Sequence, residues 1–206
     1  MPPAEPSAER VGNDARERIG ILGGTFDPVH VGHLMDASAA RHQLGLDRVL
    51  VVVARDPWQK RERVIAPAEI RYDMLVAALD GVSGIDASRI ELERDGPTYT
   101  IDTVEQLASP ERELFLVLGS DVVAGLSSWH RVDELRERVT LAIVDREPSP
   151  FPGPPGWKVA RVSVPRLELS STDLRDRVAA GEPIDFLVPT AAARILHAHD
   201  LYRADG

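Results

Sequence analysis

The sequence predicts a doubly wound α/β fold in a single domain, with a parallel sheet that carries helices on both faces. Short runs of apolar and β-branched residues alternate along the chain with segments of helical spacing. Two of these runs, 48–53 and 114–118, are apolar throughout, which is typical of strands buried on both sides of a parallel sheet. The chain has 206 residues, which is enough for one good-sized core.

The first half of the chain is predicted to alternate between strands and helices. An apolar run at 18–22 ends in Gly23 and Gly24, as a buried strand entering a turn does, and Gly45 ends a helix over 34–44. After the strand at 48–53, Pro67 and Glu69 begin a helix. Its predicted buried stripe is Ile70, Met74, Leu75, Ala78 and Leu79. Ile85 with 89–92 is predicted as a short strand region, and 101–107 as a helix.

The second half continues the alternation. The predicted strands are 114–118, 139–145 and 157–164, and the predicted helices are 132–138, 171–180 and 190–199. Residues 147–156 hold five of the 16 prolines of the chain and are predicted to form a surface loop. Residues 1–18 are rich in Pro, Ala and Glu and are predicted to be a disordered tail, so that the folded domain is 19–206.

Composition excludes several classes of site. The chain has no cysteine, which excludes disulfides, thiolate catalysis and cysteine-ligated metal, and which suits a cytoplasmic protein. No apolar run approaches the roughly 18 residues that cross a membrane. The net charge of −9 repels nucleic-acid backbones, so no nucleic-acid partner is expected, whereas a small polyphosphate needs only local cations and N–H groups. The sequence leaves homo-oligomerisation open.

The segment between the first predicted strand and helix carries the chemistry. Gly23 and Gly24 allow a sharp turn and a close approach to a ligand. His30 and His33 flank Gly32 at the helix entrance, where unpaired N–H groups and the helix dipole favour an anion. Two histidines at this spacing could also bind a metal ion, but no third ligand is nearby. The spacing alone therefore favours phosphate binding only modestly.

The whole segment resembles a known family signature. It reads Gly-Gly-Thr-Phe-Asp-Pro-Val-His-Val-Gly-His-Leu over 23–34 and resembles the His-x-Gly-His signature of nucleotidyltransferases, in the form found in nicotinate-nucleotide adenylyltransferases. A second segment, Ser-Ser-Thr-Asp-Leu-Arg over 170–175, resembles the Ser-x-Thr-x-x-Arg of the same family. Two hydroxyls and a guanidinium at a helix N-terminus can hold the β- and γ-phosphates, although Ser170 alone would be interpreted as a helix cap.

The resemblance covers about 19–202 and implies a Rossmann-like fold, ATP with Mg²⁺, and nicotinate mononucleotide as the acceptor. The acceptor phosphate would attack the α-phosphorus of ATP in line and release pyrophosphate, without a general base. The implied catalytic residues are His30, His33 and Arg175. The implied ATP-binding residues are Gly23, Gly24, Thr25, Phe26, His30, His33, Gly119, Asp121, Ser170, Thr172 and Arg175.

The acceptor side follows from further local matches. The segment Thr98-Tyr99-Thr100 resembles the one beside the nicotinate pocket, and Trp129 resembles the tryptophan that stacks on the pyridine ring. The alternative role of Thr98-Tyr99-Thr100 is a helix cap, and that of Trp129 is a partly buried core aromatic. Asp121, in Gly119-Ser120-Asp121, could likewise be a helix cap in place of a nucleotide-binding residue. Lys60 lies in the densest basic cluster of the chain, and Arg146 is the cation expected near the acceptor phosphate.

Two departures from the family pattern bear on the acceptor. Trp58 and Gln59 stand where relatives often carry a histidine that contacts phosphate, and Glu147 adds an anion beside Arg146. Two alternatives follow. One is an adenylyltransferase with another phosphorylated acceptor, either nicotinamide mononucleotide or pantetheine phosphate. The other is a catalytically silent nucleotide-binding regulator, against which the two histidines and Arg175 argue.

Overall fold

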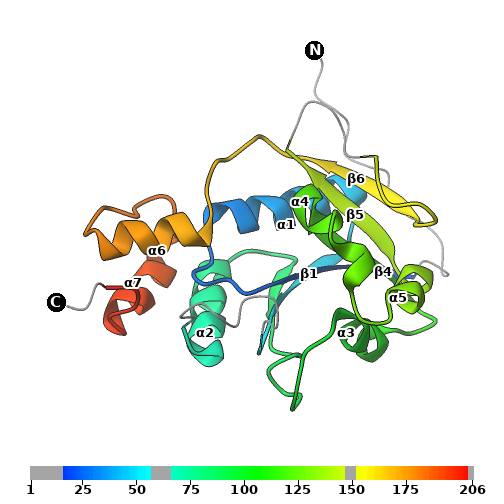
Figure 1. Cartoon of the computed structure of the whole chain (residues 1–206), viewed down its shortest axis with the longest axis horizontal. Helices are drawn as coiled ribbons and strands as arrows, with labels where there is room; N and C mark the ends of the chain where they lie inside the picture. The colour runs from blue at the N-terminus through cyan, green and yellow to red at the C-terminus, as the bar shows by residue number, and fades with distance from the viewer. Residues whose placement is uncertain (1–15, 57–65, 147–151, 204–206) are drawn as a thin grey trace.

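A six-stranded, all-parallel sheet forms the centre of the molecule (Figure 1). The computed structural model describes residues 16–56, 66–146 and 152–203. The strands, in chain order, are β1 (Glu17–Gly24), β2 (Arg48–Val53), β3 (Ile85–Ser88), β4 (Arg112–Gly119), β5 (Thr140–Asp145) and β6 (Val159–Ser163). Their order across the sheet is β3-β2-β1-β4-β5-β6. The predicted Rossmann-like α/β fold is therefore confirmed.

Helices cover both faces of the sheet. They are α1 (Val31–Leu44), α2 (Ala68–Leu79), α3 (Thr100–Leu107), α4 (Ser120–Val123), α5 (Val132–Arg138), α6 (Ser171–Ala179) and α7 (Thr190–Ala198), with a short 3₁₀ helix, η2 (Leu126–Ser128). One hydrophobic cluster joins the sheet to α1, α2, α6 and α7, and a second joins it to α3, α4, η2 and α5.

The strand sequences explain these two clusters. Val49, Val51 and Val53 of β2 face the first cluster, whereas Leu50 and Val52 face the second. Successive side chains of a strand point to opposite faces, so a run that is apolar at every position is buried on both sides.

The strand order reverses between β1 and β4, where the chain passes from one half of the sheet to the other. Ligands of open α/β sheets bind at such a reversal, outside the carboxyl ends of the strands. Gly24 ends β1 and Gly119 ends β4, so the two segments singled out in the sequence emerge side by side at this point.

Some predicted boundaries differ from the structure. Residues 89–92 form a turn, in which the N–H of Leu92 donates to the carbonyl of Arg89 at 2.8 Å, and the edge strand β3 consists of Ile85–Ser88 alone. β1 already begins at Glu17, while residues 1–15 of the predicted tail lie outside the described residues. Among the described helices, none is long and apolar enough to cross a membrane.

Candidate active site

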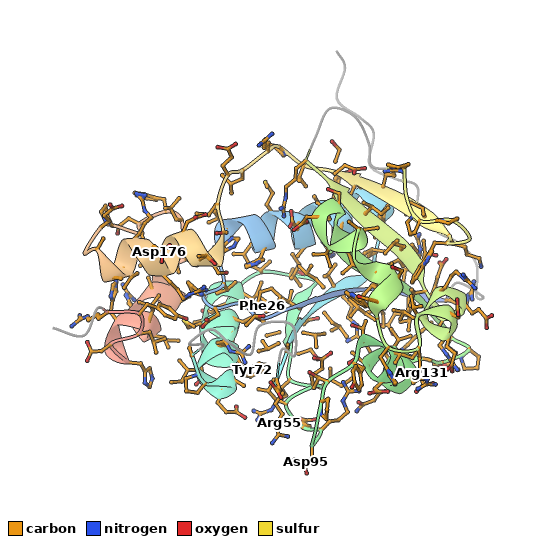
Figure 2. All side chains as sticks on the ribbon, in the orientation of Figure 1. Phe26, Arg55, Tyr72, Asp95, Arg131 and Asp176 are labelled. Atoms are coloured by element: carbon orange, nitrogen blue, oxygen red, sulfur yellow. The ribbon has the colours of Figure 1, made fainter. Side chains whose placement is uncertain are left out.

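The loop between β1 and α1 is tightly packed, with the Phe26 side chain against the backbone of Gly24. Phe26 adopts a left-handed conformation at φ 51° and lies near the middle of the molecule (Figure 2). Its ring packs so closely under Gly24 that a Cβ atom there would lie 2.8 Å from Phe26 Cζ. Only glycine at position 24 leaves room for this ring. The aromatic ring in turn meets His33 edge to face, with the ring centroids 4.9 Å apart.

His30 and His33 form a stacked pair at the entrance of α1. Their ring centroids lie 3.7 Å apart, with 24° between the ring planes. The backbone N–H of His30, the N-cap residue, donates to Nδ1 of His33 at 3.3 Å. Since Nδ1 accepts this bond, the proton of the neutral His33 ring is assigned to Nε2. A Cβ atom on Gly32 would lie 3.0 Å from Nδ1 of His30, so glycine here keeps the pair closely packed.

His30 is the more buried of the two histidines, with 5% of its surface exposed. Burial, and secondarily the cation Arg146, lower the pKa of His30 from its usual 6.5 to about 4, against the opposing effect of Asp173. His30 is therefore a neutral imidazole at physiological pH. A neutral ring can donate one hydrogen bond without adding charge to the unliganded site.

The depressed pKa of His30 predicts a pH dependence of stability. The unfolded chain binds a proton at His30 below pH 6.5 and the folded chain only below about 4, so the stabilisation is present above 6.5 and is lost as the pH falls to 4. The loss should amount to about 3 kcal/mol in the free energy of unfolding. Chemical unfolding of the unmodified chain and of His30→Gln, compared between pH 7 and 4, measures it. An equal pH slope in both proteins would contradict the prediction.

Asp27 fixes the loop between β1 and α1 through three hydrogen bonds. Its buried carboxylate accepts from the Tyr202 hydroxyl at 2.5 Å and from the Ala66 N–H at 3.0 Å. Its backbone carbonyl accepts from Nη1 of Arg175 at 2.8 Å. Residues that lie far apart in the sequence are thus brought together under the histidine loop, because each satisfies a polar group that the loop would otherwise bury unpaired.

A fully buried arginine on α2 supports the same loop. The Arg71 guanidinium is 1% exposed and donates to the carbonyl oxygens of Ala66 at 2.9 Å, Thr25 at 2.6 Å and Ala54 at 2.8 Å. These carbonyls come from the loop after β1, the segment after β2 and the approach to α2. Arg71 therefore fixes the ends of two adjacent strands relative to one another.

The second motif docks directly on the first. Ser170 is the N-cap of α6 and forms a capping box with Asp173, so the cap interpretation of Ser170 is observed. The Ser171 hydroxyl donates to the carbonyl of Pro28 at 3.0 Å, and Nη2 of Arg175 donates to Oγ1 of Thr172 at 3.1 Å. The two segments that resemble family signatures, over 140 positions apart in the chain, therefore form one continuous site.

Three further predicted residues, Gly119, Asp121 and Arg146, lie at or just after the ends of β4 and β5. Gly119 precedes α4, where a Cβ atom would lie 2.5 Å from Oδ1 of Asp121. Arg146 follows β5 and donates to Oδ2 of Asp36, on α1, at 2.5 Å. Arg146 and Asp121 both act electrostatically on Asp36, which places them in one neighbourhood with α1.

The predicted acceptor residues follow β3 and β4. Tyr99 is the N-cap of α3, and its ring lies against His130 with the centroids 4.2 Å apart. Thr98 is buried and hydrogen-bonds to Glu91, so its hydroxyl supports the loop. Tyr99 and Trp129 both pack against the second core cluster, so they share one side of the sheet.

A network of hydrogen bonds holds the loop before Thr98. The Thr103 hydroxyl donates to the buried Glu91 carboxylate at 2.7 Å, and Arg94 donates to Thr103 at 2.6 Å. Arg55, after β2, donates to the carbonyl of Arg94 and to the Asp95 carboxylate; Arg55 and Asp95 lie close together at the lower edge of Figure 2. The acceptor loop is thus held by Thr103 on α3 and by Arg55 after β2.

Lys60, with the departures at Trp58 and Glu147, lies outside the described residues. Four residues that the sequence did not single out join the site or its support: Asp36, Arg71, His130 and Tyr202. Of these, only Arg71 gave a signal in the sequence, because it is a charged residue beside the predicted apolar stripe of its helix. No group of three His, Asp or Glu side chains in the described part of the chain could hold a metal ion.

Comparison with known proteins identifies the family of the chain. Residues 21–177 match the Cytidylyltransferase-like family. A probable nicotinate-nucleotide adenylyltransferase of Saccharopolyspora erythraea is 42% identical over 194 residues, which cover 92% of each chain. The protein of that description from Bacillus pumilus is 37% identical over 190 residues, covering 91% of this chain and all of its own.

Solved structures show the same fold. The nicotinic acid mononucleotide adenylyltransferase of Plasmodium falciparum, complexed with NaAD, matches with a TM-score of 0.73 over 90% of this chain and 97% of that one, at 21% identity. A putative nicotinate-nucleotide adenylyltransferase of Vibrio parahaemolyticus matches with a TM-score of 0.66 over 92% and 97%, at 21% identity. At this identity the likeness establishes the fold alone.

Proposed function

We propose, from the premise that this chain belongs to the nicotinate-nucleotide adenylyltransferases of the Cytidylyltransferase-like family, that it transfers the adenylyl group of ATP to nicotinate mononucleotide. The products are deamido-NAD and pyrophosphate, in NAD biosynthesis. The single observation that carries the proposal is the stacked pair of His30 and His33 at the N-terminus of α1, with the Ser-x-Thr-x-x-Arg helix docked on the same loop.

The chemistry requires positioning and charge stabilisation more than proton transfer. An oxygen of the acceptor phosphate attacks the α-phosphorus of ATP; the new P–O bond forms as the bond to the oxygen bridging to the β-phosphorus breaks, and pyrophosphate leaves with that electron pair. The attacking oxygen is already ionised near neutral pH, so no base is needed. His30 and His33 would donate hydrogen bonds to the α-phosphate oxygens, on which charge changes in the transition state.

The phosphates distal to the reaction would lie at the start of α6. Arg175 and Thr172 are hydrogen-bonded to each other and lie directly beside the histidine loop. A guanidinium in this place can bind the β- and γ-phosphates during attack and the pyrophosphate after it. Ser170 would contribute through its position at the helix N-terminus, where N–H groups face an anion. Gly23, Gly24, Thr25, Phe26, Gly119 and Asp121 complete the proposed ATP site.

The acceptor would lie near the segments that follow β3, β4 and β5, which carry the predicted acceptor residues. The start of α3, at Thr98, Tyr99 and Thr100, can offer backbone N–H groups to the nicotinate carboxylate. Trp129 would stack on the pyridine ring, and Arg146 and Lys60 would attract the acceptor phosphate.

Mg²⁺ belongs to the proposal as a companion of ATP. The described residues hold no cluster of three potential ligands, so the ion would be bound mainly by phosphate oxygens and water. When bound, it would neutralise phosphate charge. A cytoplasmic location and the absence of a nucleic-acid partner, both expected from the sequence, stay predictions.

Pyrophosphate release from ATP in the presence of each acceptor tests the proposed function. Release with nicotinate mononucleotide, and formation of deamido-NAD, are expected. Release only with pantetheine phosphate would identify another acceptor, and nucleotide binding without release would identify a silent regulator. The named relatives favour neither of these alternatives.

Acceptor choice should favour the acid over the amide mononucleotide. Each hydrogen bond to the carboxylate contributes about 1.5–3 kcal/mol, so one or two bonds favour the acid by roughly 10- to 10³-fold in kcat/KM. Trp129→Ala should weaken both acceptors alike, because stacking does not distinguish a carboxylate from an amide. Steady-state kinetics with both acceptors measure the ratio. Equal kcat/KM values in the unmodified chain would overturn the choice of nicotinate mononucleotide.

A further inference from the structure

Asp36 is a buried carboxylate in the middle of the site that none of the sequence motifs includes. It lies in the second turn of α1, and only 7% of its side chain is exposed. Oδ2 accepts from Nη2 of Arg146 at 2.5 Å. Oδ1 is also buried and has no hydrogen-bond partner among the described residues.

Such a carboxylate is costly to keep in a helix that faces the core. Burial raises the pKa of Asp36, while the charge and hydrogen bond of Arg146 lower it and the charge of Asp121 raises it further. A buried ion pair stabilises a fold poorly compared with well-packed apolar residues. Packing therefore does not explain an acidic residue at this position of α1, and its interaction with Arg146 is the remaining explanation.

The partner, Arg146, connects Asp36 to the reacting groups. It follows the carboxyl end of β5; Nη2 of its guanidinium bonds Asp36, and 35% of its side chain is exposed, so the residue faces both Asp36 and the space open to a ligand. Its charge also reaches His30, where it lowers the pKa. Within the described part of the chain, the other charged groups that act on this neighbourhood are Asp121, on Asp36, and Asp173, on His30.

We infer that Asp36 is a positioning residue for the reaction: it holds the Arg146 guanidinium at the entrance of α1, where the cation receives the acceptor phosphate. This inference rests on the proposed function, since it needs a phosphorylated acceptor at Arg146. An unpaired arginine at the end of a strand would be free to turn into solvent. Asp36 restricts it by a charge-assisted bond and leaves its other N–H donors for the phosphate, because a guanidinium has five.

A double-mutant cycle of Asp36→Asn and Arg146→Ala tests the inference. The asparagine is nearly isosteric with aspartate but loses the charge that anchors the guanidinium. We expect Asp36→Asn to raise KM for nicotinate mononucleotide by roughly 10-fold, with KM for ATP changed less than about twofold. The double variant should have the same acceptor KM as Arg146→Ala alone, because Asp36 acts through Arg146.

The matched control is Asp73→Asn. Asp73 is an exposed residue of α2, and its substitution makes the same change in net charge away from the site. It should leave both KM values unchanged. Should Asp36→Ala, made in parallel, fold poorly, the isosteric asparagine still completes the cycle, and its thermal midpoint is measured beside its kinetics.

The possible outcomes separate the two proposals. Losses that add in the double variant would mean that Asp36 acts independently of Arg146, and would overturn the inference. A lower acceptor KM in Asp36→Asn would also overturn it, because the carboxylate would then only compete with the phosphate. If the unmodified chain releases no pyrophosphate with nicotinate mononucleotide, the proposed function is wrong. That result is seen before any variant is made, so it is distinguishable from a failure of the inference about Asp36.

Discussion

Replacing His33 with alanine is expected to lower kcat by roughly 10²-fold or more, while the affinity for ATP changes much less. The expectation depends on which atom of the ring can donate. Nδ1 of His33 accepts the backbone N–H of His30, which assigns the ring proton to Nε2. A donor fixed in this way strengthens its bond as charge develops on the α-phosphate, so its loss costs more in the transition state than in the ground state.

Steady-state kinetics of His33→Ala, together with direct measurement of ATP binding, check this expectation. His42→Ala is the matched control, because His42 is an exposed histidine in the last turn of the same helix. It should behave as the unmodified chain does. Near-normal turnover of His33→Ala would remove His33 from the mechanism, and if that normal turnover came with a loss of ATP affinity, His33 would be assigned to ground-state binding.

The sequence predicted the parts of this site that are local in the chain. The segment 23–34 is continuous, and its glycines, histidines and helix entrance all lie within one strand–turn–helix unit. Strand and helix positions were also predictable, since alternation of apolar side chains depends on neighbours a few positions apart. One exception was 89–92, where Ile90 and Leu92 gave an apolar pattern but the backbone turns at Arg89.

The parts that were missed depend on contacts between distant residues. Tyr202 reaches Asp27 across 175 positions, and Arg146 reaches Asp36 across 110. No local spacing signals such a pair. An arginine such as Arg71, in an otherwise apolar helix face, indicates only that some partner exists; the three carbonyls it serves become apparent once β1 and β2 are side by side.

Replacing Arg175 with alanine is expected to lower kcat/KM for ATP by roughly 10²-fold, through a higher KM and a lower turnover. Arg175 joins two parts of the site: it donates to the carbonyl of Asp27 at 2.8 Å and to the Thr172 hydroxyl at 3.1 Å, and it lies 3.7 Å from the Asp27 carboxylate. A guanidinium in this place would hold both ATP and the leaving pyrophosphate. Its loss should therefore affect both ATP binding and the step in which pyrophosphate leaves.

The same contacts give Arg175 a structural role, which the experiment has to separate from binding. Removing it leaves the buried Asp27 carboxylate without one of its two nearby cations, the other being Arg71, so some loss of thermal stability accompanies the kinetic effect. Arg175→Lys keeps the charge and loses the planar fork, and should recover stability more fully than kcat/KM. Arg177→Ala, two positions further along α6 and paired with Glu182 at 3.5 Å, is the matched control and should leave ATP kinetics unchanged. A lower thermal midpoint with normal kcat/KM at a temperature where Arg175→Ala is folded would show that Arg175 supports the loop without binding phosphate.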